Sequence, residues 1–183
     1  MSKVLTYKYS TEAIANFSNS ELARQEKNDC VVRAVAAASG SAYEPAHQFV
    51  KEVFGRNNQE GTFGVGVTIE KIAGVTQMIG KSQTTFEVLP EDKKVNYYKL
   101  HGQVIKRQKT VKSFIQDNKK GTFLVLVAKH AFVIKDGVLI DNRGEEFRPT
   151  RKVQDAFKVE ASVQTGAIIV LIYIVRDIIE RAI

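Results

Sequence analysis

The chain contains one cysteine, Cys30, and its position suits a nucleophile. Asn28 or Asp29 can cap a helix, and apolar residues then recur at helical spacing until Gly40 ends the pattern. The N–H groups and dipole at a helix N-terminus favour negative charge. They can lower a thiol pKa from about 8.5 into roughly the 3.5–7.5 range. The alternative is a small buried apolar side chain, which describes most lone cysteines.

His130 stands in the apolar segment LVAKHAFVI, where a histidine is ordinarily a hydrogen-bonded core residue. Asp136-Gly137 predicts a two-residue turn just after it. In that hairpin position 130 pairs with 143, so Asp141 is the diagonal neighbour of His130 on the same face. A carboxylate there can orient the imidazole, as a Cys–His pair requires. Asn142 is the alternative if a bulge shifts the register.

Such a site also needs donors for an oxyanion. The backbone N–H of Cys30 can supply one, and the side chain of Gln25 is either a second or an ordinary exposed amide. His47 and His101 are poorer bases, since one lies on a helix face and the other in a basic stretch. No metal-ligand spacing and no G-x-S-x-G motif is present, so we expect neither a metal nor a cofactor.

The elements that must position these residues form one domain over 1–183. Hydrophobic residues make up 44% and charged residues 26% of the 183-residue chain, which is typical of a globular protein. We expect helices over 11–24, from about 30 to 40, and over 44–54, 69–79 and 110–117. Strands are expected over 86–89 and, two or three in number, within 121–142. Helices first and sheet second predict an α+β fold.

The last apolar run, 167–175, is too short to span a bilayer, and its β-branched content favours a buried strand. We therefore expect no membrane span. A single cysteine and the absence of a secretory signal predict a cytoplasmic location.

The net charge is +7, and much of the excess lies in the stretch 93–120. A solvated face is the ordinary explanation of such a stretch. A surface for nucleic acid or for an acidic partner is the alternative.

The segments QEKNDCVVRAVAAASG and AKHAFVIKDGVLIDN resemble the papain-like cysteine peptidase superfamily. The likeness is closest to bacteriocin-leader-processing peptidase domains and to small phage and bacterial relatives, over roughly 20–60 and 108–160. NDCVVRAV also resembles, more weakly, the signature of ovarian-tumour-type deubiquitinases. The resemblance implies Cys30 as nucleophile, His130 as base, Asp141 as orienting group and Gln25 as oxyanion donor. Gln25 stands five residues before the cysteine, whereas six is usual in this superfamily.

Three functions follow as hypotheses. The first is a cysteine hydrolase of phage origin that cleaves a peptide or isopeptide bond, with a protein or peptide as substrate. The second is a catalytically inactive papain-like protein that binds a host protein. The third is a nucleic-acid-binding module that uses the basic stretch 93–120.

Overall fold

The computed structural model describes residues 17, 19–57, 60–141 and 148–163. The fold is mixed α+β, with helices in the N-terminal part and an antiparallel sheet in the C-terminal part, as the sequence predicts. Its helices are α2 (Glu21–Gln25), α3 (Cys30–Ser39), α4 (Tyr43–Phe54), α5 (Val65–Ile72), α6 (Glu91–Lys94) and α7 (Val111–Asp117). Its strands are β1 (Gln77–Ile79), β2 (Ser82–Val88), β3 (Val95–Leu100), β4 (Gln103–Gln108), β5 (Thr122–Val127), β6 (His130–Lys135), β7 (Val138–Ile140) and β8 (Val153–Val163).

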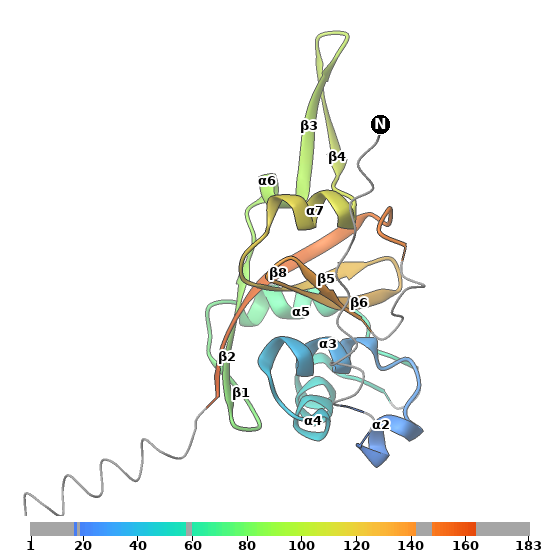
Figure 1. The fold of residues 1–183 in the computed structure, drawn as a ribbon, viewed down its shortest axis with the longest axis vertical. Helices are drawn as coiled ribbons and strands as arrows, with labels where there is room; N and C mark the ends of the chain where they lie inside the picture. Colours follow the sequence, from blue (N-terminus) through green and yellow to red (C-terminus); the bar gives the residue numbers. More distant parts are fainter. Residues whose placement is uncertain (1–16, 18, 58–59, 142–147, 164–183) are drawn as a thin grey trace, which may run out of the picture.

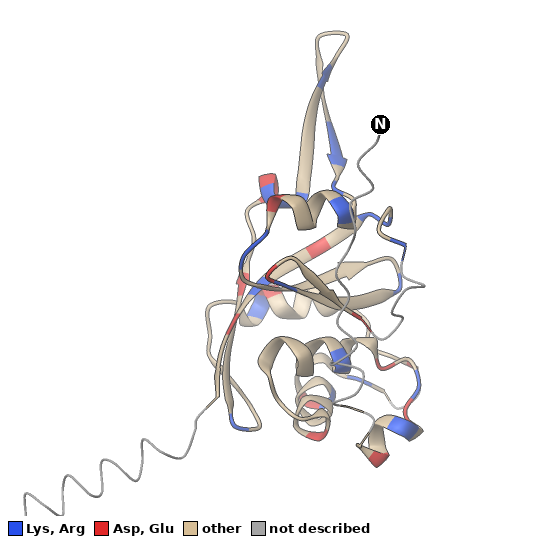
Figure 2. Ribbon diagram, viewed as in Figure 1, with Lys and Arg blue, Asp and Glu red and all other residues tan. Residues whose placement is uncertain are grey.

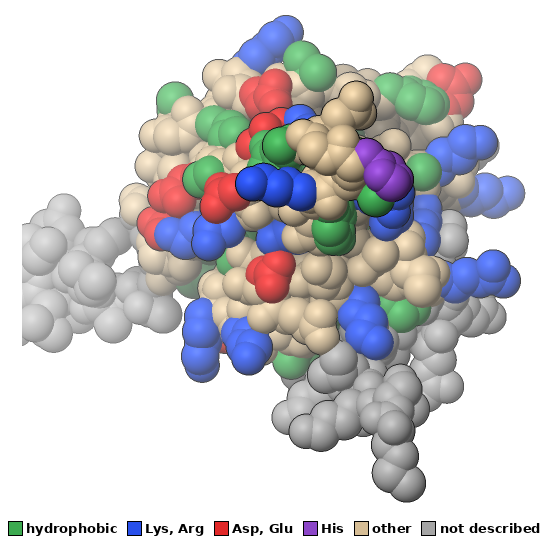
Figure 3. Space-filling model, turned by 90° about the horizontal axis from the view of Figure 1, so that it is seen from above, with side chains coloured by type: hydrophobic (Ala, Val, Ile, Leu, Met, Phe, Trp, Pro, Cys, Tyr) green, Lys and Arg blue, Asp and Glu red, His purple; other side chains and the backbone are tan. Residues whose placement is uncertain are grey.

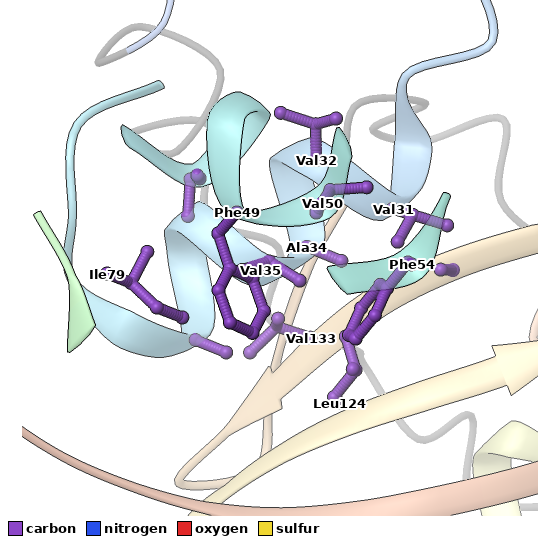
Figure 4. Packing of buried hydrophobic residues seen from close by; sticks show 14 of the residues in the cluster. Val31, Val32, Ala34, Val35, Phe49, Val50, Phe54, Ile79, Leu124 and Val133 are labelled. Carbon is purple, nitrogen blue, oxygen red and sulfur yellow. The ribbon is translucent and has the colours of Figure 1, made fainter. Parts of the chain in front are cut away.

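Helix α3 is the element that carries Cys30, and it is buried along nearly its whole length. Its alanines and valines bring the backbone close to its neighbours, and it ends at Gly40, whose φ of 69° suits a left-handed cap. Figure 4 shows side chains of α3 and α4 meeting Leu124 and Val133 of the sheet. This packing fixes the position of the α3 N-terminus relative to the sheet.

The six-stranded sheet has the order β1-β2-β8-β5-β6-β7, and every neighbouring pair is antiparallel. Alternate residues of β5 serve two cores: Leu124 packs with α3 and α4, whereas Phe123 and Val125 pack with Phe114 of α7. The helices α3 and α4 therefore cover one face and α7 the other (Figure 1). Strand β8, which the sequence analysis does not predict, lies at the centre.

The hairpin of β6 and β7 has the register that Asp136-Gly137 predicts. Both turn residues have positive φ, 48° and 76°, which is the two-residue turn that matches strand twist. Val133 pairs with Ile140, so the predicted register is confirmed over the paired residues of this hairpin.

Two other expectations need correction or fall outside the described chain. The helix expected over 69–79 is wrong in its second half, because α5 ends at Ile72 and Gln77–Ile79 form β1, which pairs with β2 through a turn at Gly80. Half of the helix expected over 11–24 and all of the strand expected over 167–175 lie outside the described residues. In the described half, Asn19 and Ser20 are not helical, and α2 begins at Glu21 with Ser20 as its N-cap. In the portion described, no helix is long and apolar enough to cross a membrane.

The basic stretch contains a second sheet that the sequence analysis does not predict. Within the described part of the chain, strands β3 and β4 pair only with each other and form a two-stranded arm that projects from the body (Figure 1). The arm turns at His101 and Gly102, which both have positive φ. At its foot, helix α6 precedes β3 and helix α7 follows β4.

Candidate active site

Cys30 is the first residue of α3, at a helix N-terminus whose N–H groups have no side-chain cap. The N-cap residue, Asp29, turns its carboxylate instead toward the Arg33 guanidinium and the Tyr43 hydroxyl, both at 2.8 Å. The first intrahelical bond runs from the Arg33 N–H to the Asp29 carbonyl. The N–H groups of the first turn therefore remain available to an anion at Cys30.

His130 and Asp141 form a buried pair. The Nε2 of His130 lies 2.8 Å from one carboxylate oxygen of Asp141 and 3.0 Å from the other. Only 7% of His130 and 5% of Asp141 are exposed. Asp141 directly follows β7, so the two-residue turn brings it back beside the first residue of β6. The carboxylate holds the imidazole with Nε2–H as the donor, which directs Nδ1 as the proton acceptor of the site.

Cys30 meets His130 at the start of β6. Among the described residues, β7 pairs with 133–135 of β6, and the first residues of β6 lie beyond this paired part. There the Cys30 sulfur interacts with the His130 imidazole and with the backbone N–H of Ala131. Helix α3 and the start of β6 thus bring the two side chains together although 100 residues separate them in sequence.

The contacts favour the charged forms of both side chains. Burial raises the pKa of the Cys30 thiol, but hydrogen bonds from His130 and from the Ala131 N–H together outweigh it and hold that pKa below its ordinary value. Burial lowers the pKa of His130, but Asp141 and Cys30 together raise it above its ordinary value. A thiolate–imidazolium pair therefore forms over a wider pH range than two isolated groups would allow.

An open cleft of about 750 Å³ lies against this pair. One wall is the start of α3, the second is the loop 60–66, and the third is the turn between β5 and β6, with Gln154 beside it. Phe63 stands in the loop wall with 78% of its surface exposed. The sulfur is thus open to a substrate on one side and held by His130 and Ala131 on the other.

A buried ion pair fixes the loop that leads into Cys30. The side chain of Arg56, just beyond α4, is fully buried and donates to the Glu26 carboxylate at 2.6 Å. It also donates to the carbonyls of Lys27 and Asn28, at 2.9 and 3.1 Å. Glu26 additionally lies 3.0 Å from Nε2 of His47. The sequence gives no local signal for Arg56, because it acts from 28 residues away.

The structure brings Cys30, His130 and Asp141 together but leaves Gln25 elsewhere. The Gln25 amide donates to Glu21 at 3.3 Å on the exposed side of α2, and Gln25 is not among the residues that line the cleft. The chain changes direction directly after it, where Arg56 and His47 hold Glu26. The oxyanion role expected for Gln25 is therefore not supported by its position. Asn142, the alternative to Asp141, lies outside the described residues.

The other two histidines do not line the cleft. His47 is bound to Glu26, and His101 lies at the tip of the arm. Among the described residues, no group of three or more His, Cys, Asp and Glu side chains is placed to hold a metal ion. The comparisons with models of known protein families, with curated proteins and with solved structures find no match to this chain.

Proposed function

We propose that this protein is a cysteine hydrolase of papain-like type that cleaves a peptide or isopeptide bond. The observation that supports this most is the open cleft against a thiol that interacts with His130, which is in turn bound by Asp141. A structural cysteine needs neither a buried carboxylate behind its histidine partner nor access to a cleft. A reducing compartment such as the cytoplasm would keep the thiol active.

In this proposal the Cys30 thiolate attacks the carbonyl carbon and forms a tetrahedral oxyanion. The first-turn N–H groups of α3, left without a side-chain cap, supply the donors for that oxygen. The oxyanion collapses, the C–N bond breaks, and His130 transfers its proton to the leaving amine. His130 then takes a proton from water as the water oxygen attacks the thioester carbonyl. The C–S bond breaks, which releases a carboxylic acid and restores the Cys30 thiolate beside protonated His130.

The cleft suits an extended chain. Its loop wall contains Gly61 and Gly64, whose backbone groups have no side chain of their own between them and the cleft. The opposite wall includes the first residues of β6, His130 and Ala131. Backbone groups on both walls favour a peptide over a small ester or amide.

Two measurements test the proposal together. The labelling rate of Cys30 by iodoacetamide is followed from about pH 4 to about pH 9 in the wild type and in His130→Ala. We expect rapid labelling of the wild type at acidic pH and its loss in His130→Ala. A mixed peptide library, analysed by mass spectrometry, is expected to be cleaved by the wild type and not by Cys30→Ala.

The two measurements separate the hydrolase from an inactive relative. Rapid acidic labelling without cleavage of peptides or of ubiquitin-type isopeptides would favour an inactive papain-like protein that binds a host protein. The position of Gln25 outside the cleft is the observation that keeps this second candidate. Slow labelling with an ordinary thiol profile in both proteins would overturn the thiolate–imidazolium pair itself.

A further inference from the structure

The arm formed by β3 and β4 is exposed to solvent over nearly its whole length. Val95 at its foot is its one buried residue, and Asn96 and Ile105 are half-buried. A two-stranded ribbon is only marginally stable alone, so such an arm is expected to have a binding partner. Here the ribbon also carries large exposed side chains, with Tyr98 51%, Leu100 49% and Val104 65% exposed. The partner must therefore offer contacts for aromatic and aliphatic groups.

The charge of the arm identifies the chemistry of that partner. Residues 95–108 contain Lys99, Lys106 and Arg107 and no acidic residue. Figure 2 shows blue positions on the arm and no red, while both colours occur on the body. Lys99 and Arg107 form no ion pair with any described residue. Such a ribbon complements a polyanion.

The two faces of the arm differ in their contacts with the rest of the protein. On one face, Tyr97 donates to Glu91 of α6 at 2.6 Å, and Lys106 binds the same carboxylate. These contacts tie that face to the foot of the arm. The opposite face keeps its side chains for another molecule: Asn96, Tyr98, Leu100, Gln103, Ile105 and Arg107, as the strand register gives them.

We propose that the β3–β4 arm binds nucleic acid. Its opposite face combines a cation for phosphate (Arg107), an aromatic ring for stacking (Tyr98) and amides for base edges (Asn96, Gln103). Lys99, on the first face of the same ribbon, supplies a second cation for phosphate. A two-stranded ribbon also has a width that enters the major groove of a duplex. Figure 3 looks onto the end of the molecule that carries the arm and shows lysine and arginine side chains there, with acidic side chains among them. An acidic protein surface would use the cations but would leave the tyrosine and amides without a specific role.

The site is independent of the proposed hydrolase. The arm is joined to the body through α6 and α7, and α7 covers the face of the sheet opposite α3, the helix of Cys30. Variants of the arm should therefore leave the labelling of Cys30 unchanged. That labelling rate serves as a control for the fold of the body in every variant.

The test measures fluorescence anisotropy of a labelled single-stranded DNA of about 20 nucleotides and of its duplex, at salt concentrations from about 50 to about 200 mM. The arm variant is the double substitution Lys99→Gln/Arg107→Gln. The control is the double substitution Lys119→Gln/Lys120→Gln, which removes the same charge after the far end of α7. We expect the arm variant to bind at least about ten-fold more weakly and to lower the salt slope by about two, with a change under about two-fold in the control. Tyr98→Ala should weaken single-strand binding by about five-fold or more if bases stack on the ring.

The outcomes separate the proposal from its rivals. If the protein prefers the single strand and Tyr98→Ala removes this preference, the bases stack on the tyrosine ring. If the protein binds the duplex and this binding depends on Lys99 and Arg107, the arm contacts a groove or the backbone. Both outcomes support nucleic acid as the ligand. Equal losses in the two double variants would overturn the arm as the site. If polyglutamate displaces the DNA at equal charge and Tyr98→Ala has no effect on DNA binding, the ligand is an acidic protein. That result would overturn nucleic acid as the ligand. A variant with residues 97–106 replaced by Gly-Gly should lose binding while retaining Cys30 labelling.

Discussion

At the scale of single residues, the candidate site consists of three side chains with one task each. In the proposed mechanism Cys30 supplies the sulfur and His130 moves the proton, while Asp141 holds the ring through Nε2 at 2.8 and 3.0 Å. The shifts of the Cys30 and His130 pKa values in opposite directions follow from these contacts. The charge of Asp141, and not only its hydrogen bond, is part of this arrangement, because a neutral acceptor stabilises an imidazolium less well.

Replacing Asp141 by Asn tests that charge. Without it the pKa of His130 falls, the thiolate loses its cationic partner, and the pKa of Cys30 rises. The profile of iodoacetamide labelling should therefore move to higher pH, and any peptide turnover should fall by roughly 10²–10⁴-fold. Asp117→Asn makes the same chemical change at an exposed carboxylate and should leave both measurements unaltered. An unchanged profile in Asp141→Asn would show that Asp141 has only a packing role.

Sequence could predict the proximity of His130 and Asp141 because it depends on a local turn. Asp136-Gly137 determines the register of β6 and β7, and the register determines which side chains share a face. The position of Gln25 could not be predicted in this way. It depends on the direction of the chain after α2, which is set by Arg56 and His47, two side chains distant in sequence.

At the scale of elements, the site depends on how the end of α4 holds the loop before α3. Arg56 contributes three hydrogen bonds to this loop from a side chain with no exposed surface. Burial raises the pKa of Glu26, but Arg56 and His47 together outweigh it and hold that pKa below its ordinary value. The stabilisation from Glu26 is therefore present above the pKa of the unfolded chain and is lost as the pH falls through the folded pKa.

Arg56→Ala should destabilise the protein by about 3 kcal/mol, because it leaves Glu26 and two carbonyls without their donor. Urea denaturation measures the loss, and the variant should also lose less stability on acidification than the wild type does. Lys158→Ala breaks two exposed ion pairs and should cost under about 1 kcal/mol. Equal effects of the two substitutions would contradict a clamp at Arg56.

At the scale of the whole molecule, the six-stranded sheet separates two hydrophobic cores and, with them, the cleft from the arm. The core with α3 and α4 supports the cleft, and the core with α7 lies toward the arm. The sequence pattern was sufficient to predict α3 and α4 of the first core and the strands around His130. It was not sufficient for β8, whose central place depends on pairing with β2 and β5 from distant parts of the chain. Nor did it predict the arm, because its strands are exposed on both faces and therefore lack the alternation that marks a half-buried strand.

Two phenylalanines separate the stability of the whole fold from the use of the cleft. Phe157, at the centre of β8, is completely buried, and Phe157→Ala should lower the free energy of unfolding by about 3–5 kcal/mol. Phe63 belongs to the cleft wall with 78% of its surface exposed, so Phe63→Ala should change stability by less than about 0.5 kcal/mol. Urea denaturation measures the change in stability of both variants.

Phe63→Ala also tests the use of the cleft, which peptide cleavage measures. Since an exposed aromatic ring at a cleft contributes to binding rather than to folding, Phe63→Ala should lower kcat/KM and leave iodoacetamide labelling of Cys30 intact. A variant that cleaves peptides as well as the wild type would place the substrate along another wall of the cleft, whereas one that also loses labelling would show that the loop 60–66 supports the sulfur itself.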